Sequence, residues 1–92
     1  TWSTTIRMFY TYVIENKKGN WYIGMTNDLR RRFRQHQAEE TYTLRKLGGA
    51  PWRLIYYEAC EHQFDARQRE KYLKTGRGRA YLKQRLQYYR KT

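Results

Sequence analysis

The feature that most constrains the fold is a pair of aromatic, β-branched runs on either side of a short polar segment. Residues 8–14 read MFYTYVI and residues 21–25 read WYIGM, with Gly19 and Asn20 at the end of the segment between them. Runs of this composition are typical of β-strands, and Gly and Asn are typical of turns. The pattern predicts a β-hairpin, with Gly24 as a bend where the second strand ends.

A helix is predicted directly after the hairpin. Thr26 to Asp28 supply several residues that favour a helix N-cap. In the segment that follows, Leu29, Phe33 and Gln37 recur at a spacing of four and therefore share one face. We expect that face to lie against the sheet, over a helix of residues 29–37.

The rest of the chain predicts one more strand and two more helices. Residues 38–51 contain two glycines and a proline and are predicted to be mostly loop, and residues 52–58 (WRLIYYE) are predicted to be a strand. A helix is predicted over 64–75, stopped by Gly76, and a last helix over 79–89. The expected fold class is α+β, in the order β-β-α-β-α-α, with helices packed on a small three-stranded sheet.

The charge of the chain indicates its partner. There are 20 Lys and Arg residues against 8 Asp and Glu, which gives a formal net charge of +12, and 17% of the residues are aromatic. A charge of this size favours a polyanionic partner, and the aromatic side chains favour nucleic acid. The alternative is a protein that is merely basic, and charge and aromatic content together argue against it.

Several function classes are excluded by composition. The single cysteine, Cys60, allows no disulfide within the chain and is expected to be a small buried residue. No Cys/His cluster has zinc spacing, no apolar run could span a membrane and no signal peptide is visible. We expect no membrane partner and a place in the cytoplasm or in a nucleoid within it. Residues 8–89 are expected to form one domain, with residues 1–7 an N-terminal extension or an expression remnant.

Two polar residues of the first predicted helix occupy an unusual place. Arg32 and His36 lie four apart, so they share one face, and they flank the stripe of Leu29 and Phe33 that should face the core. One interpretation is that they reach toward the end of the hairpin to hold an anion. The plain alternative is that Arg32 belongs to a solvated basic face formed by its neighbouring arginines.

Glu70 is a second anomaly. In the predicted helix 64–75, Glu70 shares a face with Ala66 and Leu73, which should be the inner face. An ionised carboxylate there costs several kcal/mol unless it is paired. Glu70 therefore either pairs at the edge with one of the many basic residues or binds a hard cation such as Mg²⁺, which takes oxygen ligands and often only one or two protein carboxylates.

These residues and two tyrosines of the hairpin could together hydrolyse a phosphodiester. Tyr12 and Tyr22 lie on the two paired strands. A phenol, with its ordinary pKa of about 10, can act as a general base only if another group takes or shares its proton. His36 could do so, Arg32 could stabilise charge on the phosphate, and Glu70 could hold a metal near the leaving oxygen.

Four motifs, each weak singly, occur together between Met8 and Leu86. They are Tyr10-Thr11-Tyr12, Tyr22-Ile23-Gly24, Thr26-Asn27-Asp28-Leu29 followed by Arg32 and His36, and the helix positions Ala66, Glu70, Leu73 and Lys74. In combination they resemble the motifs of the GIY-YIG endonucleases, especially the short bacterial single-domain members. The resemblance implies a three-stranded antiparallel sheet flanked by helices.

The resemblance also implies a role for each site residue. Tyr12 would be the general base, Tyr22, Arg32 and His36 would bind the phosphate or poise the base, and Glu70 would bind one divalent ion, Mg²⁺ or Mn²⁺. There are two departures from the family pattern. Tyr10-Thr11 stands for Gly-Ile, at positions that carry no chemistry. Larger members also use an asparagine after the glutamate helix, and this sequence has none beyond Asn27, so Gln84 would substitute.

A basic surface is predicted around the last two helices. The Gly-rich segment 75–79 either holds a nucleic-acid backbone or is a helix C-cap with solvated arginines. Tyr88 or Trp52 could stack on an unpaired base, although Trp52 is expected in the core. The predicted nucleic-acid-binding residues are Lys74, Arg77, Arg79, Lys83, Gln84 and Arg85.

Two functions from different classes follow. The first is a metal-dependent endonuclease acting on DNA, including branched or damaged DNA, and selective for structure rather than sequence. Larger family members carry a separate DNA-binding domain that these 92 residues do not include, so we expect low sequence specificity or a separate protein partner that supplies it. The second is a non-catalytic basic nucleic-acid-binding module that retains the fold.

Overall fold

The computed structural model describes residues 6–38 and 41–91. Of the predicted extension 1–7, residues 1–5 lie outside the described residues, and Ile6 and Arg7 are exposed. The elements are β1 (Phe9–Asn16), β2 (Trp21–Thr26), α1 (Leu29–Ala38), α2 (Tyr42–Lys46), β3 (Trp52–Cys60), α3 (Gln63–Leu73), α4 (Gly76–Arg85) and α5 (Gln87–Arg90).

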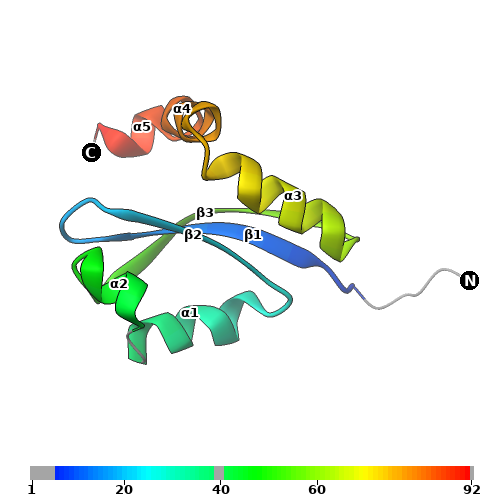
Figure 1. The fold of residues 1–92 in the computed structure, drawn as a ribbon, viewed down its shortest axis with the longest axis horizontal. Helices are drawn as coiled ribbons and strands as arrows, with labels where there is room; N and C mark the ends of the chain where they lie inside the picture. The colour runs from blue at the N-terminus through cyan, green and yellow to red at the C-terminus, as the bar shows by residue number, and fades with distance from the viewer. Residues whose placement is uncertain (1–5, 39–40, 92) are drawn as a thin grey trace, which may run out of the picture.

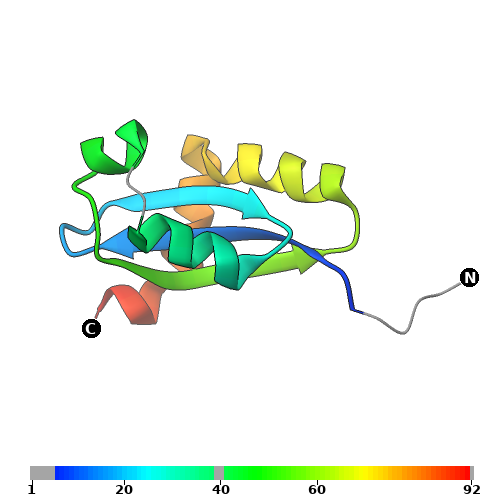
Figure 2. The same cartoon turned by 90° about the horizontal axis from the view of Figure 1, so that it is seen from below.

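The three strands form one antiparallel sheet in the order β2-β1-β3, so the first strand is central. Helices α1 and α2 lie on one face of this sheet, and α3 and α4 lie on the other (Figures 1 and 2). The predicted α+β class, with an antiparallel three-stranded sheet flanked by helices, is confirmed.

The core consists of two clusters, one on each face of β1. Successive side chains of a strand point to opposite faces. Accordingly, Tyr12 and Ile14 pack with Leu44 and Trp52 under α1 and α2, where the expected burial of Trp52 is confirmed. Val13 instead belongs to the cluster on the other face, which is completed by Ile23 of β2 and by Leu73 and Leu82 of α3 and α4.

The predicted hairpin turn is organised by Asn16. Its side-chain Oδ1 accepts hydrogen bonds from the backbone N–H groups of Lys18 and Asn20, at 3.1 and 3.0 Å, and Gly19 adopts a φ of +81°. The Nδ2 of Asn16 donates to the carbonyl of Leu47 at 2.7 Å. The turn is therefore tied to the segment before β3 as well as closed on itself.

Residues 41–51, within the segment predicted to be mostly loop, contain one short helix as well as loop. They include α2, with Thr41 as its N-cap, whose side chain accepts from the N–H of Leu44 at 3.2 Å. Leu44 is fully buried beneath this helix. One buried leucine therefore docks this five-residue helix. The neighbouring glycines and proline had favoured the prediction of a loop.

The prediction that Gly76 stops a helix was wrong. Helix α3 ends at Leu73, and Thr75 caps the next helix, accepting from the N–H of Gly78 at 3.1 Å. Gly76 is thus the first residue of α4. A Cβ at Gly78 would lie 2.0 Å from the carbonyl oxygen of Tyr72, so this glycine lets α4 start directly against the end of α3.

Two further expectations are corrected. The last helix is not continuous over 79–89, because α4 ends at Arg85 and α5 begins after Leu86, whose backbone is not helical. Cys60, expected to be buried, is only half-buried at the end of β3.

In the described part of the chain, no helix combines the length and the apolar composition that crossing a membrane would require.

Candidate active site

The side chain of Tyr12 lies across the edge strand β2. Tyr12 is buried and is paired in register with Gly24. A Cβ at Gly24 would lie 2.5 Å from the Tyr12 hydroxyl oxygen and 2.7 Å from its Cζ atom. Gly24 is therefore part of β2 rather than the predicted bend, and its missing side chain provides the space that the phenol occupies.

His36 meets Tyr12 from the C-terminal half of α1. Its Nε2 lies 2.6 Å from the hydroxyl oxygen of Tyr12, and the imidazole is only 3% exposed. The ring of Tyr22 packs against both, with ring centroids 5.2 Å from His36 and 6.5 Å from Tyr12. The structure thus brings together three of the predicted site residues in one aromatic cluster.

Burial sets the protonation states in this cluster. Loss of water lowers the pKa of His36 to about 4, with a smaller contribution from the Arg32 guanidinium, so the imidazole is neutral near pH 7. Burial also raises the pKa of Tyr12 to about 12, an effect that Arg32 partly offsets. With both groups neutral, the phenol O–H can donate to Nε2, and in that arrangement the imidazole carries its own proton on Nδ1.

Arg32 borders the cluster and keeps its charge available. It is half-buried, unlike Arg30, Arg31 and Arg34, which are exposed, so it is not simply a member of a solvated basic face. Its Nη1 donates to Oε1 of Gln35 at 3.2 Å. Among the described residues it forms no ion pair with a carboxylate. It also lines an open cavity of about 350 Å³, where an anion could reach it.

Glu70 reaches the site from α3, on the other face of the sheet. Its neighbours Ala66 and Leu73 are fully buried, as predicted, while the Glu70 side chain is 15% exposed at the edge. Its Oε2 lies 3.1 Å from Nζ of Lys74. The carboxylate is near enough to Tyr12 to contribute slightly to the raised pKa of the phenol.

The position of α3 depends on a contact that the sequence did not indicate. Thr11, beside Tyr12 on β1, donates its hydroxyl to the carbonyl of Ala66 at 3.0 Å. Ala66 lies one helical turn before Glu70.

On the opposite face, the side-chain amide of Gln37 forms hydrogen bonds with both the N–H and the carbonyl of Trp52, at 2.7 and 2.8 Å. These bonds dock the end of α1 that carries His36.

The donor set fits a metal held by few protein ligands. Within residues 6–38 and 41–91, no three His, Cys, Asp or Glu side chains gather where they could hold an ion. Glu70 is close enough to the tyrosine cluster to act on the pKa of Tyr12, and its Lys74 partner is exposed and can leave. Mg²⁺ commonly binds one or two carboxylates and completes its octahedron with waters and substrate phosphates. Glu70 alone is therefore sufficient on the protein side.

The predicted nucleic-acid-binding residues are all exposed. Lys74 pairs with Glu70, Arg79 and Lys83 line one cavity, and Gln84 and Arg85 line another beside Tyr81 and Tyr88. Tyr88 is 77% exposed, in keeping with its expected availability. Arg77 is in the first turn of α4, so the Gly-rich segment is a helix start.

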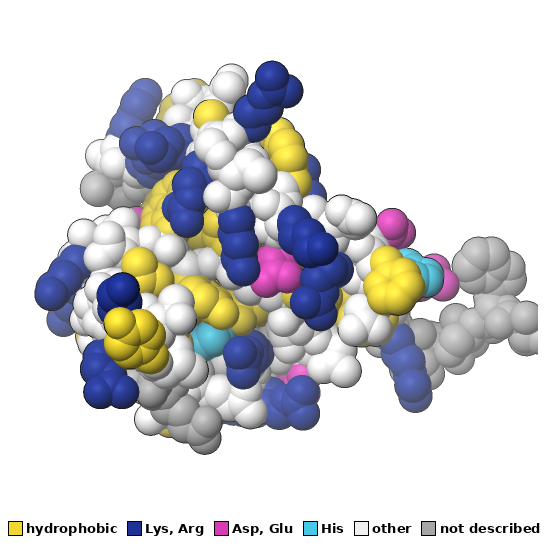
Figure 3. All heavy atoms as spheres, viewed as in Figure 1, with side chains coloured by type: hydrophobic (Ala, Val, Ile, Leu, Met, Phe, Trp, Pro, Cys, Tyr) yellow, Lys and Arg dark blue, Asp and Glu magenta, His cyan; other side chains and the backbone are white. Residues whose placement is uncertain are grey.

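Basic side chains cover much of the face that includes the α3 and α4 surfaces. Figure 3 shows Lys and Arg spread over the view, with acidic side chains confined to small patches between them.

Gly24 is a site residue that the sequence analysis did not identify. The hairpin register, in which Tyr12 and Gly24 are equally far from the turn, was the signal that could have revealed it.

Comparison with known proteins identifies the class. Residues 8–85 match the family model described as the GIY-YIG catalytic domain, so the chain belongs to the GIY-YIG family, which is a nuclease family. It is 35% identical to the UPF0213 protein CPE1444 of Clostridium perfringens, over 73% of this chain and 71% of that protein. It is 38% identical to a UPF0213 protein of Limosilactobacillus reuteri, over 72% and 70% of the two chains.

A solved structure gives the same result. The solution NMR structure of the UPF0213 protein BH0048 from Bacillus halodurans has a TM-score of 0.51 to this chain at 32% identity, covering 82% of this chain and 81% of that one. The resemblance inferred from the motifs, to short single-domain GIY-YIG proteins, is thereby confirmed.

Proposed function

We propose that this protein is a metal-dependent endonuclease that hydrolyses phosphodiester bonds in DNA, with Tyr12 as the general base. The observation that carries the proposal is the 2.6 Å contact between the Tyr12 hydroxyl and the neutral imidazole of His36. A phenol with its pKa raised to about 12 is a poor base alone. A phenol that passes its own proton to an imidazole as it accepts another avoids becoming a phenolate.

The proposed proton path runs through two side chains. A water molecule attacks phosphorus, a P–O bond forms, and the bond to the leaving oxygen breaks, so that this oxygen departs as an alkoxide with the bonding electron pair. As the water oxygen attacks, its proton moves to the Tyr12 oxygen and the phenol proton moves to Nε2 of His36, which becomes imidazolium. The phosphate anion beside the cluster favours this positive charge, against the burial that lowers the pKa of His36 in its absence.

Arg32, Tyr22 and Glu70 have supporting roles in this proposal. The guanidinium of Arg32 binds the non-bridging oxygens and stabilises the charge that develops on them. Tyr22, packed against Tyr12 and His36, orients the phosphate. A divalent ion on Glu70, Mg²⁺ or Mn²⁺, would supply Lewis-acid stabilisation at the leaving oxygen.

We expect the substrate to be recognised by structure rather than by sequence. The exposed cations of α3 and α4 suit contacts with phosphates, which position a nucleic acid but carry no sequence information. Branched or damaged DNA would then be distinguished by the spacing and direction of its backbones. Selectivity beyond this would come from a separate protein partner.

A non-catalytic nucleic-acid-binding module is the second candidate. The observation that favours it is the ion pair between Glu70 and Lys74, in which a cation of the chain occupies the carboxylate that would hold the metal. In that case the tyrosine cluster would serve only to pack the sheet against α1.

A cleavage assay separates the two candidates. The protein is incubated with supercoiled plasmid and with branched and linear duplexes, in Mg²⁺, in Mn²⁺ and in EDTA, and Tyr12→Phe is run in parallel. Metal-dependent cleavage that Tyr12→Phe lacks supports the nuclease. Binding without cleavage of any substrate, in either metal, supports the module.

A further inference from the structure

A second site is built away from the tyrosine cluster, where the hairpin turn meets the C-terminal helices. A cavity of about 520 Å³ opens there. Four cationic side chains from three different elements line it. These are Arg53 of β3, Arg79 and Lys83 of α4, and Arg90 of α5. Within the part of the chain that is described, none of the four forms an ion pair with a carboxylate.

The single acidic residue of the cavity holds its wall together. One carboxylate oxygen of Glu15 accepts from Trp21 Nε1 at 2.8 Å, and the other accepts a short hydrogen bond from the Tyr89 hydroxyl. The carboxylate thereby joins β1, β2 and α5, and both of its oxygens are engaged by neutral donors. Four cations against one carboxylate leave the cavity with a net charge of +3.

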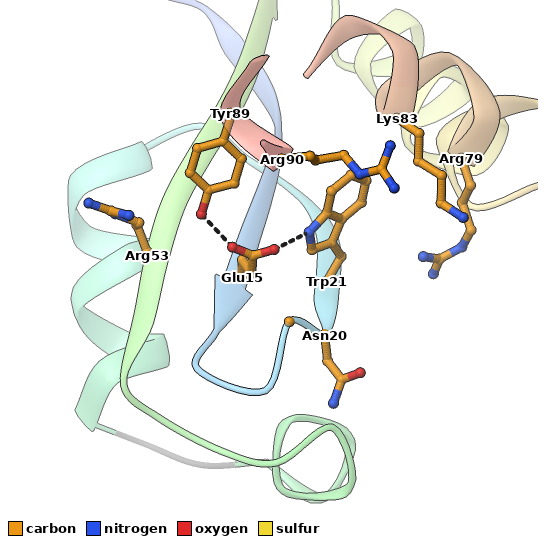
Figure 4. Close-up of a pocket in the computed structure, with 9 residues that line it drawn as sticks. Glu15, Asn20, Trp21, Arg53, Arg79, Lys83, Tyr89 and Arg90 are labelled. Carbon is orange, nitrogen blue, oxygen red and sulfur yellow. Dashed lines mark hydrogen bonds between the residues drawn. The ribbon is translucent and has the colours of Figure 1, made fainter. Parts of the chain in front are cut away.

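The cations are not evenly placed around this wall. Figure 4 shows Arg90 beside the indole of Trp21, with Lys83 and Arg79 following on the same side, whereas Arg53 lies beyond Glu15 and Tyr89. Arg53 is close enough to Tyr89 to lower the pKa of its hydroxyl, against the larger rise that burial causes. The side of the cavity between Trp21 and α4 therefore carries three of its four cations.

The cavity adjoins the candidate active site through one strand. Trp21 and Tyr22 are consecutive residues of β2, so their side chains point to opposite faces of the sheet from Cα atoms about 3.8 Å apart. Tyr22 faces the tyrosine cluster, whereas Trp21 packs with the cluster under α3 and α4. Since β2 is an edge strand, a nucleic-acid backbone passing over that edge can contact both sites.

We propose that this cavity binds a second phosphodiester group of the same nucleic acid, held by Arg79, Lys83 and Arg90, with Trp21 in contact with the adjoining nucleoside. The inference rests on the proposed function, because it takes the ligand to be the nucleic acid held at Tyr12. It adds that the substrate must extend past the scissile phosphate toward the hairpin turn. Inorganic phosphate shares this chemistry and is the other source to be tested.

The first test compares two matched pairs of substitutions. Arg79→Gln with Lys83→Gln removes two charges from the cavity, and Arg45→Gln with Lys46→Gln removes the same two residue types from α2, on the opposite face of the sheet. DNA binding is measured in EDTA across a range of salt concentrations. We expect the cavity pair to weaken binding at least tenfold and to reduce the slope of log affinity against log salt by about 1, the loss of one phosphate contact. The α2 pair should leave the slope unchanged. Equal effects of the two pairs would overturn the inference, since net charge alone would explain them.

The second test identifies the ligand through Trp21 fluorescence. The Trp21 signal is isolated as the difference between the parent protein and Trp21→Phe. A short DNA duplex should change this signal at micromolar concentration, and inorganic phosphate at the same phosphate concentration should not. A response to inorganic phosphate equal to that of DNA would assign the cavity to the free ion and overturn the proposal.

The two proposals fail separately. Binding is measured without metal, so a parent protein that binds DNA through the cavity but never cuts it defeats the proposed nuclease alone. A parent protein that cuts DNA, and whose cavity pair behaves like the α2 pair, defeats this inference alone. A parent protein that binds no DNA defeats both.

Discussion

The hydroxyl oxygen of Tyr12 and Nε2 of His36 lie 2.6 Å apart and are both buried, although the two residues are 24 positions apart in the chain. The contact depends on a glycine in the edge strand, on the docking of α1 and on an imidazole that stays neutral. Each of these three requirements can be tested by substitution. The roles of the Glu70 carboxylate and of the net positive charge can be tested in the same way.

Removing the phenol oxygen should stop cleavage. Tyr12→Phe keeps the ring that packs the sheet, and we expect its cleavage rate to fall by about 10²–10⁴-fold, as for the loss of a general base. The Nε2 of His36 is left unsatisfied, which should cost about 1–3 kcal/mol of stability. Kinetics and thermal unfolding of Tyr12→Phe and Tyr22→Phe check this. If Tyr22→Phe is inactive while Tyr12→Phe cuts like the parent, the roles of the two tyrosines are reversed.

Stability should depend on pH through His36. Burial lowers the pKa of His36 to about 4 in the folded protein, below the value of about 6.5 expected when the chain is unfolded. The unfolded state therefore binds the proton first as the pH falls, so stability is full above about pH 6.5 and is lost progressively down to pH 4. Between pH 7 and pH 5 the loss should be about 2 kcal/mol.

Urea unfolding at the two pH values measures this difference. His36→Gln should largely remove it, while His62→Gln, a change at an exposed histidine, should retain it. A pH dependence that survives in His36→Gln would show that another group is responsible.

A single methyl group on the edge strand should disrupt the site. In Gly24→Ala, the new Cβ would lie 2.5 Å from the Tyr12 oxygen, so the ring must move and its contact with His36 is lost. We expect a loss of about 1–3 kcal/mol in stability, as for overpacking, together with a fall in cleavage. Gly76→Ala is the matched control, since a Cβ there meets nothing within 4 Å and should be neutral or stabilising by up to about 1 kcal/mol. Gly24→Ala with parental stability and activity would mean that the phenol does not need this position.

The carboxylate of Glu70 should be required for metal-dependent cleavage and not for binding. Glu70→Ala should abolish cleavage while retaining DNA affinity in EDTA, because removing a negative charge does not weaken attraction to phosphate. Lys74→Met frees the same carboxylate from its ion pair and should tighten Mn²⁺ binding measured by calorimetry. Full cleavage by Glu70→Ala would exclude it as the metal ligand.

Affinity for DNA should depend steeply on salt. A chain with a net charge of +12 should contact several phosphates and displace their counterions. Log affinity should then fall linearly with log salt, with a slope of about −0.9 for each phosphate contacted on duplex DNA. Fluorescence anisotropy with several unrelated duplexes should give similar slopes and affinities for each. A flat salt profile, or a strong preference for one duplex, would contradict this.

Most of the sheet and the longer helices could be predicted because their patterns are local. The runs around Tyr12 and Tyr22 are rich in aromatic and β-branched residues, which favour strands, so the two runs predict a hairpin. Helix α2 was missed because Leu44 is its only buried residue, too little for a periodic pattern. The start of α4 was missed because Thr75 as an N-cap and Gly76 as a stop are both reasonable locally.

The tyrosine cluster was predicted because short sequence motifs mark its residues. The Trp21 cavity was not predicted because no such motif marks it. Four short motifs point to Tyr12, His36 and their neighbours, and the family model matches the region that contains them. The cations of the cavity come from β3, α4 and α5. Only Arg79 and Lys83, four apart on α4, are related by their spacing in the sequence. The carboxylate of Glu15 contributes to bringing the cations together, because it joins the first strand to the last helix through Tyr89.

The glycine at position 78 has a consequence for how the domain would handle its substrate. The lack of a side chain there lets α4 begin in direct contact with the end of α3. Glu70 on α3 and Arg79 and Lys83 on α4 are therefore carried by two helices that are in direct contact where one ends and the next begins. On the proposals above, the fold sets the distance between the two sites that contact phosphates. A nucleic acid whose phosphates have another spacing would have to bend in order to occupy both sites.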